Sequence, residues 1–222
     1  MPTRRAAVHP SAPAARYAEG DDCSRLIAVD HGDTRSGICD KVRFTADYLR
    51  VPYEWIEIDS ANGKTRTPEF LAKNPQGQVP TVEFDDGRCL SQSNAIIRKI
   101  ADGTPLLPSD PWLKSKADEW MFWEANNHEF FVAGCIGHMT YMGKSKETRD
   151  PMRVARGEKA LDILDQYLEG KNWLVGTGIT VADIALLAYN RQAHLGGYDM
   201  SMRPNIQRWI ARSEAELRLK SL

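Results

Sequence analysis

Strand-like patterns occur only in the first half of this 222-residue chain, and that separation limits the folds it can adopt. Short apolar or alternating runs at 26–29, 55–59 and 79–84 predict strands. An apolar repeat at helical spacing over 39–49 predicts a helix between the first two. Beyond residue 112 apolar residues recur only at helical spacing. This separation predicts an α/β unit followed by an all-helical unit.

The breaks in the first half set the order of its elements. The turn-prone segment 31–34 ends the first predicted strand, and a Thr-Pro-Glu sequence at 67–69 begins a short helix. The turn at 85–87 predicts a hairpin that returns through 88–90, and a last helix follows over 93–100. The order βαβ, then ββα, predicts a four-stranded mixed sheet covered by helices.

The second half contains three clear helix signals. Long apolar repeats predict helices over 113–131 and 154–168, and a proline starts another over 204–212. Between them, Thr180 and Asp183 have the spacing of a capping box, in which each side chain bonds the other residue's backbone N–H. We therefore expect an apolar, buried helix to begin at this box.

Four segments follow from these patterns. Residues 1–24 are rich in alanine and proline with almost no large apolar side chains, which predicts a disordered extension. Residues 25–101 form the α/β domain, residues 102–112, with three prolines, form a linker, and residues 113–222 form the helical domain.

Charge and composition exclude several classes of function. The 29 basic and 30 acidic residues produce no net field that would favour nucleic acid or an anionic membrane. No apolar run approaches the ~18 residues of a membrane span. The cysteines show no zinc-type pair, and a chain of this size does not need disulfides, so we expect reduced thiols in a cytoplasm and no metal site. These cysteines are Cys23, Cys39, Cys89 and Cys135.

Four segments, in this order and at these separations, resemble the glutathione S-transferase family, and the likeness covers nearly all of the chain beyond the first 25 residues. They are 36–43, 74–80, 92–96 and 179–184. The resemblance implies a thioredoxin-like N-terminal domain that binds glutathione and an all-α C-terminal domain. It also implies a homodimer that joins glutathione to a small hydrophobic electrophile, as in detoxification.

Ser36, at the start of the first helix, matches the sulfur site of the family's serine-type members, such as the theta class. A free thiol has a pKa of about 8.5, and lowering it by two units requires about 2.7 kcal/mol of thiolate stabilisation. A hydrogen bond to a charged group supplies about 1.5–3 kcal/mol and a helix N-terminus about 0.3–1 kcal/mol. A serine at this position is therefore sufficient without a metal. The alternative is that Ser36 only caps the helix.

The resemblance assigns further residues to glutathione. Val79-Pro80, in cis, would turn the Val79 backbone toward the cysteinyl part of the tripeptide, as an added strand would. Gln78 matches a position that reaches the glycine carboxylate, and Lys64 is a weaker candidate for the same group. Ser93 would hold the γ-glutamyl carboxylate at a helix start. Gln92 replaces the family's usual Glu, which removes the charge pairing with the ligand's ammonium.

The electrophile is expected between the domains, against the helix over 113–131. The candidate residues on that helix are Trp120, Trp123, Asn127 and His128. The two tryptophans are also compatible with a purely structural core role, and His128 with no chemistry. Cys39 has two interpretations, a core residue on the inner face of the first helix or the remaining cysteine of a thioredoxin-like pair.

Three other functions remain open from the sequence. Arg35-Ser36 is similar to the start of the Arg-Ser-Ser-Cys stretch of maleylacetoacetate isomerase, although Gly37-Ile38 departs from it. A disulfide-bond reductase that uses bound glutathione is the second. A non-catalytic, transferase-like binding module is the third, and the missing Glu at position 92 favours it.

Overall fold

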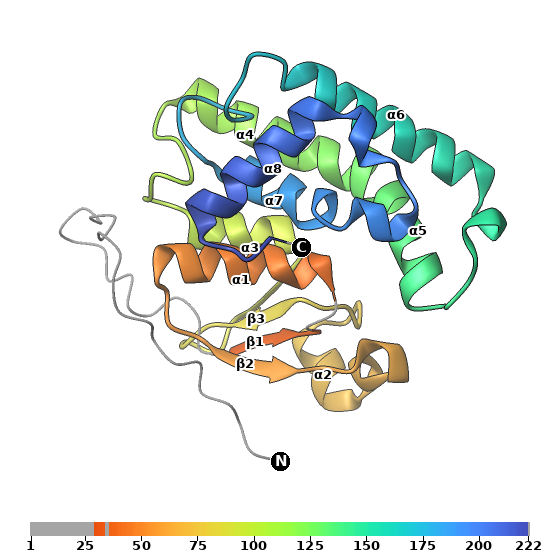
Figure 1. The fold of residues 1–222 in the computed structure, drawn as a ribbon. Helices are drawn as coiled ribbons and strands as arrows, with labels where there is room; N and C mark the ends of the chain where they lie inside the picture. Colours follow the sequence, from red (N-terminus) through yellow and green to blue (C-terminus); the bar gives the residue numbers. More distant parts are fainter. Residues whose placement is uncertain (1–28, 34–35, 222) are drawn as a thin grey trace. The chain divides into compact units, whose positions relative to one another are not determined.

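A computed structural model describes residues 29–33 and 36–221 of the chain, which fall into two compact units (Figure 1). The boundary between the units lies between Leu107 and Pro108. The predicted domain limits stay predictions, and the predicted disordered extension over 1–24 lies outside the described residues.

The first unit contains the predicted four-stranded mixed sheet, in the order β2-β1-β3-β4. β1 and β2 are parallel, whereas β3 is antiparallel to both β1 and β4. The strands are β1 (Val29–Gly32), β2 (Glu54–Glu57), β3 (Thr81–Glu83) and β4 (Cys89–Ser91). The expected βαβ-ββα order and the thioredoxin-like fold class are confirmed.

Three α-helices accompany the sheet: α1 (Gly37–Leu49), α2 (Pro68–Lys73) and α3 (Ser93–Ile100). α1 and α3 lie together on one side of the sheet, and α2 lies on the other (Figure 1). Short 3₁₀ turns occupy Ser60–Asn62 and Lys64–Arg66 before α2. α2 begins where predicted because the Thr67 hydroxyl accepts the Phe70 N–H and Pro68 takes the first helical position.

The inner face of α1 follows the predicted periodicity. Cys39, Val42 and Ala46 are at most 1% exposed, and Leu49 is 4% exposed. The same helix also buries Lys41, whose Nζ donates a hydrogen bond to Asn94 Oδ1 in α3 at 3.4 Å. Arg50 ends α1 in the left-handed conformation, two residues before the proline that the sequence marked as the stop.

The strand limits differ from the prediction in two places. His31 and Gly32 were expected in a turn, but they extend β1 because their backbones pair with Ile56 and Glu57 of β2. The predicted strand over 79–84 shrinks to β3, which begins only after Pro80, a residue that has no N–H to donate to a neighbouring strand.

The described part of the second unit is all helical, as predicted. Its α-helices are α4 (Pro111–Trp123), α5 (Phe130–Thr140), α6 (Pro151–Tyr167), α7 (Val181–Asn190) and α8 (Pro204–Leu217). Short 3₁₀ turns lie at Lys146–Thr148, Ala193–Gly196 and Met200–Met202. α4 includes Pro111 and Trp112, predicted as linker, because the Asp110 carboxylate accepts the Leu113 N–H at 2.8 Å and caps the helix.

The continuous helix predicted over 113–131 is interrupted. Glu124–Glu129 forms a π-helical segment between α4 and α5, and an extra residue in a helical turn of this kind is a common feature of functional sites. The apolar repeat could not reveal it, because a single wide turn barely shifts the pattern of buried positions.

The predicted capping box at the start of α7 is present and buried. Asp183 Oδ2 accepts hydrogen bonds from the N–H and the hydroxyl of Thr180, at 2.9 and 3.0 Å. Its other oxygen accepts the Leu174 N–H and the Trp209 indole N–H, at 3.0 and 2.9 Å. Burial raises the pKa of the Asp183 carboxyl, and these four donors oppose the rise. One carboxylate is thus bonded to the start of α7, to α8 and to Leu174 in the loop that precedes α7.

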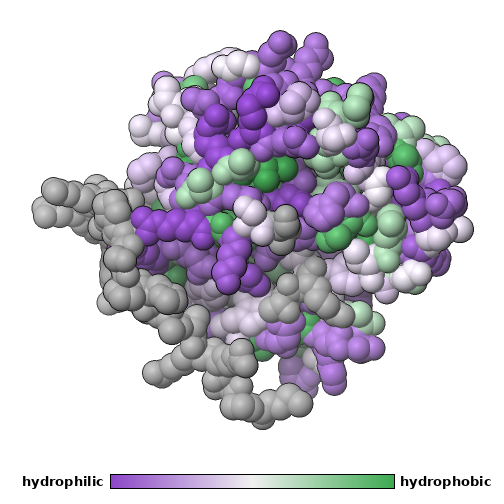
Figure 2. Space-filling model, in the orientation of Figure 1, coloured by the Kyte–Doolittle hydropathy of each residue, from purple (hydrophilic) through white to green (hydrophobic). Residues whose placement is uncertain are grey.

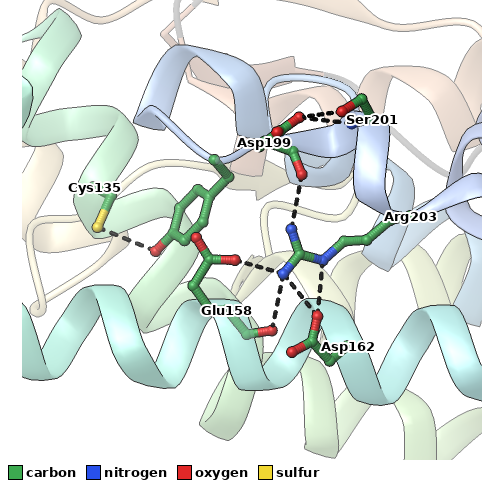
Figure 3. A network of polar contacts seen from close by, with 7 residues as sticks. Cys135, Glu158, Asp162, Asp199, Ser201 and Arg203 are labelled. Carbon is green, nitrogen blue, oxygen red and sulfur yellow. Dashed lines mark hydrogen bonds and ion pairs between the residues drawn. The ribbon is translucent and has the colours of Figure 1, made fainter.

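A second polar network joins α6 to the start of α8 (Figure 3). The Arg203 guanidinium, 7% exposed, bonds the carboxylates of Glu158 and Asp162 on α6 and the carbonyl of Asp199. A buried arginine needs such partners, since an unpaired buried charge is costly. Beside this network, the Tyr198 hydroxyl donates to Cys135 Sγ at 3.1 Å.

The surface of the protein and the hydropathy of its helices are those expected from a chain with balanced charge and ordinary apolar content. The face drawn in Figure 2 is mostly hydrophilic, with hydrophobic residues in small groups. None of the described helices is both long and apolar enough to cross a membrane.

Candidate functional site

A small pocket of about 20 Å³ opens in the first unit. It is bordered by α1, by the loop between α2 and β3, and by the junction of β4 with α3. Its lining residues are Ile38, Asn74, Gln76, Gln78, Val79, Pro80, Ser91, Gln92 and Ser93. Six of them carry neutral polar side chains and none is charged, so the lining offers hydrogen-bonding groups rather than partners for an ion pair.

The fold brings together the five residues that the sequence assigned to glutathione with most support. Gln78, Val79 and Pro80 lie 12 or more residues before Gln92 and Ser93 in the chain, yet all five line this pocket. The Val79-Pro80 peptide bond is cis, as predicted. Within the described part of the chain, no hydrogen bond involves the backbone N–H or C=O of Val79. These two groups are therefore available to an extended peptide ligand.

The junction of β4 and α3 adds a helix N-terminus to the pocket. Ser93 is the first residue of α3 and is 4% exposed, so its hydroxyl and amide sit at the positive end of the helix. Gln92, just before it, has φ 71° and ψ 106°, a conformation that costs a non-glycine residue free energy. Backbone strain of this kind is concentrated at ligand sites.

Ser36 is the N-cap of α1, with an extended backbone at φ −95° and ψ 116°. Its hydroxyl makes no side-chain hydrogen bond to the end of the helix, and the residue is half-buried. Ser36 is not among the lining residues of the pocket, although Ile38, two residues later, is. The simple capping alternative therefore lacks its hydrogen bond in the structure.

Cys39 and Lys64 lie apart from the pocket lining. Cys39 is fully buried on α1, and the Asp33 N–H donates to its sulfur at 3.4 Å, which is the environment of a core residue. Lys64 is exposed in the 3₁₀ turn Lys64–Arg66.

The four candidates for the electrophile site fall on α4 and the π-helical segment, and the aromatic ones form a cluster in the second unit. The Trp120 ring lies 5.1 Å from Trp123 and 4.6 Å from Tyr167, centroid to centroid, in edge-to-face arrangements. The His128 ring lies 6.2 Å from Trp123. Trp120 and His128 are buried, whereas Asn127 is exposed and Trp123 half-buried. Of these side chains, Asn127 and Trp123 are the more exposed.

The sequence prediction missed four residues of the pocket, which are Ile38, Asn74, Gln76 and Ser91. Asn74 is 2% exposed and its amide bonds the backbone of Gln76 and Gln78, while Gln76 bonds Gln92. Asn followed by Pro-x-Gly is a local sign of a side chain that organises its own loop, and it could have identified Asn74. Among the described residues, no group of three or more metal-ligating side chains comes together.

Comparisons with known proteins agree with this architecture. Residues 35–102 match the family model "Glutathione S-transferase, N-terminal domain", and residues 132–216 match "Glutathione S-transferase, C-terminal domain". The glutathione S-transferase GstB of Escherichia coli is 32% identical over 181 residues, 76% of this chain and 84% of that protein. The glutathione S-transferase-like protein LUC7 of a Fusarium species is 33% identical over 165 residues, 67% and 71% of the two chains.

Solved structures show the same likeness over the whole fold. The crystal structure of a glutathione S-transferase from Pseudomonas fluorescens has a TM-score of 0.82 and 41% identity, and the match covers 84% of this chain and 94% of that one. A transferase from Xanthobacter autotrophicus has a TM-score of 0.81 and 35% identity, with 87% and 94% covered. The chain therefore belongs to the glutathione S-transferase family.

Proposed function

We propose that this protein is a glutathione transferase that activates the thiol of bound glutathione for attack on a small hydrophobic electrophile. The observation that carries the proposal is the neutral pocket formed by Gln78, Val79, Pro80, Gln92 and Ser93, with the Val79 backbone open for pairing. A tripeptide has the extended backbone and the terminal carboxylates that such a pocket accommodates.

Each residue has a distinct part in binding. The Val79 N–H and C=O pair with the cysteinyl residue of glutathione, and Gln78 reaches its glycine carboxylate. Ser93, at the N-terminus of α3, receives the γ-glutamyl carboxylate, because the unpaired amides there favour an anion. Lys64, exposed beside α2, is an auxiliary cation for the glycine carboxylate.

Ser36 acts on the sulfur. Its hydroxyl, which has no capping bond, donates to the thiolate, and the first amides of α1 add their field. Together these lower the pKa of the bound thiol, which releases its proton to solvent. The thiolate then forms a C–S bond to the electrophilic carbon, and the leaving group departs with the bonding electron pair. Holding both reactants in one site makes this step effectively unimolecular.

Other properties of the proposal follow from the family and the composition. We place the protein in the cytoplasm, because the described cysteines Cys89 and Cys135 form no disulfide. We assign it a homodimeric state, the usual assembly of the family, and a role in detoxification. Trp123 and Asn127 are the accessible candidates for the electrophile contact.

The test compares binding with turnover. Isothermal titration should show one glutathione site per chain, and an aryl halide should be conjugated at the sulfur. Ser93→Ala should raise the KM for glutathione about tenfold, the value of one hydrogen bond to a charged group, whereas Ser115→Ala, an exposed serine of α4, should leave it unchanged.

The same experiment distinguishes the alternatives. Turnover of a mixed disulfide or of a keto acid, with no aryl halide conjugation, would indicate the reductase or the isomerase. Glutathione binding without turnover of any substrate would indicate a binding module. Absence of glutathione binding contradicts the transferase, the isomerase and the reductase.

A further inference from the structure

We infer that Gln76 is a positioning residue, which orients the side-chain amide of Gln92 so that its oxygen faces the ammonium of the γ-glutamyl group. The inference rests on the proposed function and concerns how the pocket distinguishes the charged end of its ligand.

The contact itself joins two side chains 16 residues apart. Gln92 Nε2 donates to Gln76 Oε1 at 3.0 Å. The amide of a glutamine can offer a ligand either its NH₂ group or its oxygen. The bond to Gln76 uses one of the two Nε2 hydrogens of Gln92 and places the amide oxygen on the side away from Gln76, where it can face the ligand.

The loop that carries Gln76 is held in place from both sides. Its N–H donates to Asn74 Oδ1 at 3.0 Å, and its carbonyl accepts from Arg66 at 3.1 Å. The same Asn74 side chain donates to the carbonyl of Gln78 at 2.8 Å and to Thr81 at 3.1 Å. At 2% exposure Asn74 is a buried anchor, so the loop presents Gln76 in one position.

The loop conformation also depends on Gly77. This residue has φ +61°, and a Cβ there would lie 2.5 Å from the Arg66 guanidinium and 2.9 Å from the carbonyl of Thr65. Glycine therefore allows Arg66 to approach the loop closely and bond the carbonyl of Gln76.

Gln92 is equally constrained at its own backbone. Its φ of 71° and ψ of 106° lie outside the helical and strand regions, while its carbonyl accepts the Ile96 N–H in the first turn of α3. Both side chains are exposed, and the Gln76–Gln92 hydrogen bond is the contact that sets the direction of the Gln92 amide.

The chemistry of the pocket explains why this direction matters. The γ-glutamyl end carries an ammonium, which only donates, and a carboxylate, which only accepts. The lining contains no carboxylate to attract the ammonium. A Gln92 amide turned the wrong way would point its NH₂ group at the ammonium and weaken binding. Held by Gln76, it supplies the acceptor that a glutamate supplies elsewhere in the family, while Ser93 serves the carboxylate.

The experiment uses two ligands and two variants. Gln76→Met has a similar length but no acceptor, whereas Gln76→Glu keeps an acceptor for Gln92 Nε2. The ligands are glutathione and glutaryl-cysteinylglycine, which lacks only the ammonium. Dissociation constants are measured by isothermal titration on the full chain, and thermal unfolding checks that each variant folds.

We expect Gln76→Met to weaken glutathione binding about fivefold, the value of one hydrogen bond. The affinity for glutaryl-cysteinylglycine should stay within about twofold of the unmutated protein, and Gln76→Glu should restore glutathione binding. Equal losses of affinity for both ligands would show that Gln76 only supports the loop. An unchanged affinity of Gln76→Met for glutathione would show that Gln76 does not orient the Gln92 amide. Either result overturns the inference. If the unmutated protein binds neither ligand, the proposed function fails as well.

Discussion

The hydroxyl side chains that precede α1 and α7 have opposite surroundings. Thr180, before α7, is 3% exposed and donates to the fully buried Asp183. Ser36, before α1, is half-buried and makes no capping hydrogen bond. Both residue types are preferred at this position for the same reason, since a side-chain oxygen can accept the unpaired amides of the first turn.

The difference shows what a helix start can be used for. At α7 the amide and the hydroxyl of Thr180 are both bonded to the protein's own carboxylate, Asp183, so this helix start contributes stability. At α1 the hydroxyl stays available, and the helix N-terminus can stabilise an external anion. The same local chemistry is structural in one unit and, under the proposed function, catalytic in the other.

The largest expected effect concerns the buried side of this comparison. Asp183→Ala should lower the free energy of unfolding by about 3–5 kcal/mol, because it leaves the Trp209 indole and the Leu174 and Thr180 amides buried without an acceptor. Urea unfolding followed by tryptophan fluorescence measures the loss.

Asp150→Ala is the matched control for Asp183→Ala. Asp150 caps α6 by accepting the Met152 and Arg153 amides, but it is exposed. We expect a cost of only about 1 kcal/mol. Similar costs at the two positions would show that burial does not distinguish the two caps.

The next largest effect concerns the open side. Ser36→Ala should raise the pKa of the bound glutathione thiol by one to two units, which corresponds to about 1.5–3 kcal/mol of lost thiolate stabilisation. The stability of the protein should change by less than about 0.5 kcal/mol, because the hydroxyl makes no capping bond. Thiolate absorbance in the ultraviolet, measured across pH, follows the first quantity.

The two readouts of Ser36→Ala separate its two roles. A stable variant with an unchanged thiol pKa would show that Ser36 is not the activator. A loss of stability of about 1 kcal/mol with an unchanged thiol pKa would restore the capping interpretation.

A smaller effect is expected at the hydroxyl that serves structure alone. Thr180→Ala should lower the free energy of unfolding by about 1 kcal/mol, because Asp183 keeps its other three donors. Thr180→Ser retains the hydroxyl and should recover part of the loss. Glutathione affinity, measured by titration, should be unchanged in both variants, and a change there would contradict the division of roles between α1 and α7.

The smallest effect is expected where a buried hydroxyl lacks any partner. Within the described residues, Ser213 Oγ on α8 is fully buried and has no hydrogen-bond partner. Ser213→Ala should change the free energy of unfolding by less than about 0.5 kcal/mol or raise it, since it removes a polar group that gains nothing from burial. A loss above 1 kcal/mol, in urea unfolding, would reveal a hydrogen bond through a buried water.

Local signals in the sequence predicted local structure well. The limits of α3 at 93 and 100, the start of α2 after Thr67, and the box of Thr180 and Asp183 are all as predicted. The start of α2 and the capping box each depend on groups three residues apart, so the deciding contact is already contained in a short window of sequence.

Contacts distant in the chain account for the errors. β1 extends through His31 and Gly32 because β2, over 20 residues later, pairs with them. The π-helical segment Glu124–Glu129 interrupts a helix that the apolar repeat predicts to be continuous. Neither a strand partner nor a local widening of a helix changes the residue pattern that the prediction depends on.

The sequence by itself determined the two-part architecture, the helix starts and the residue types available for binding a thiol peptide. Only the tertiary structure decided which of those residues share a pocket and which way they are turned. The bond from Gln92 to Gln76 and the fully buried position of Asp183 illustrate this. The physical reason is that hydrogen-bond direction and exclusion of water depend on neighbours from distant parts of the chain, and side-chain spacing along the sequence does not specify them.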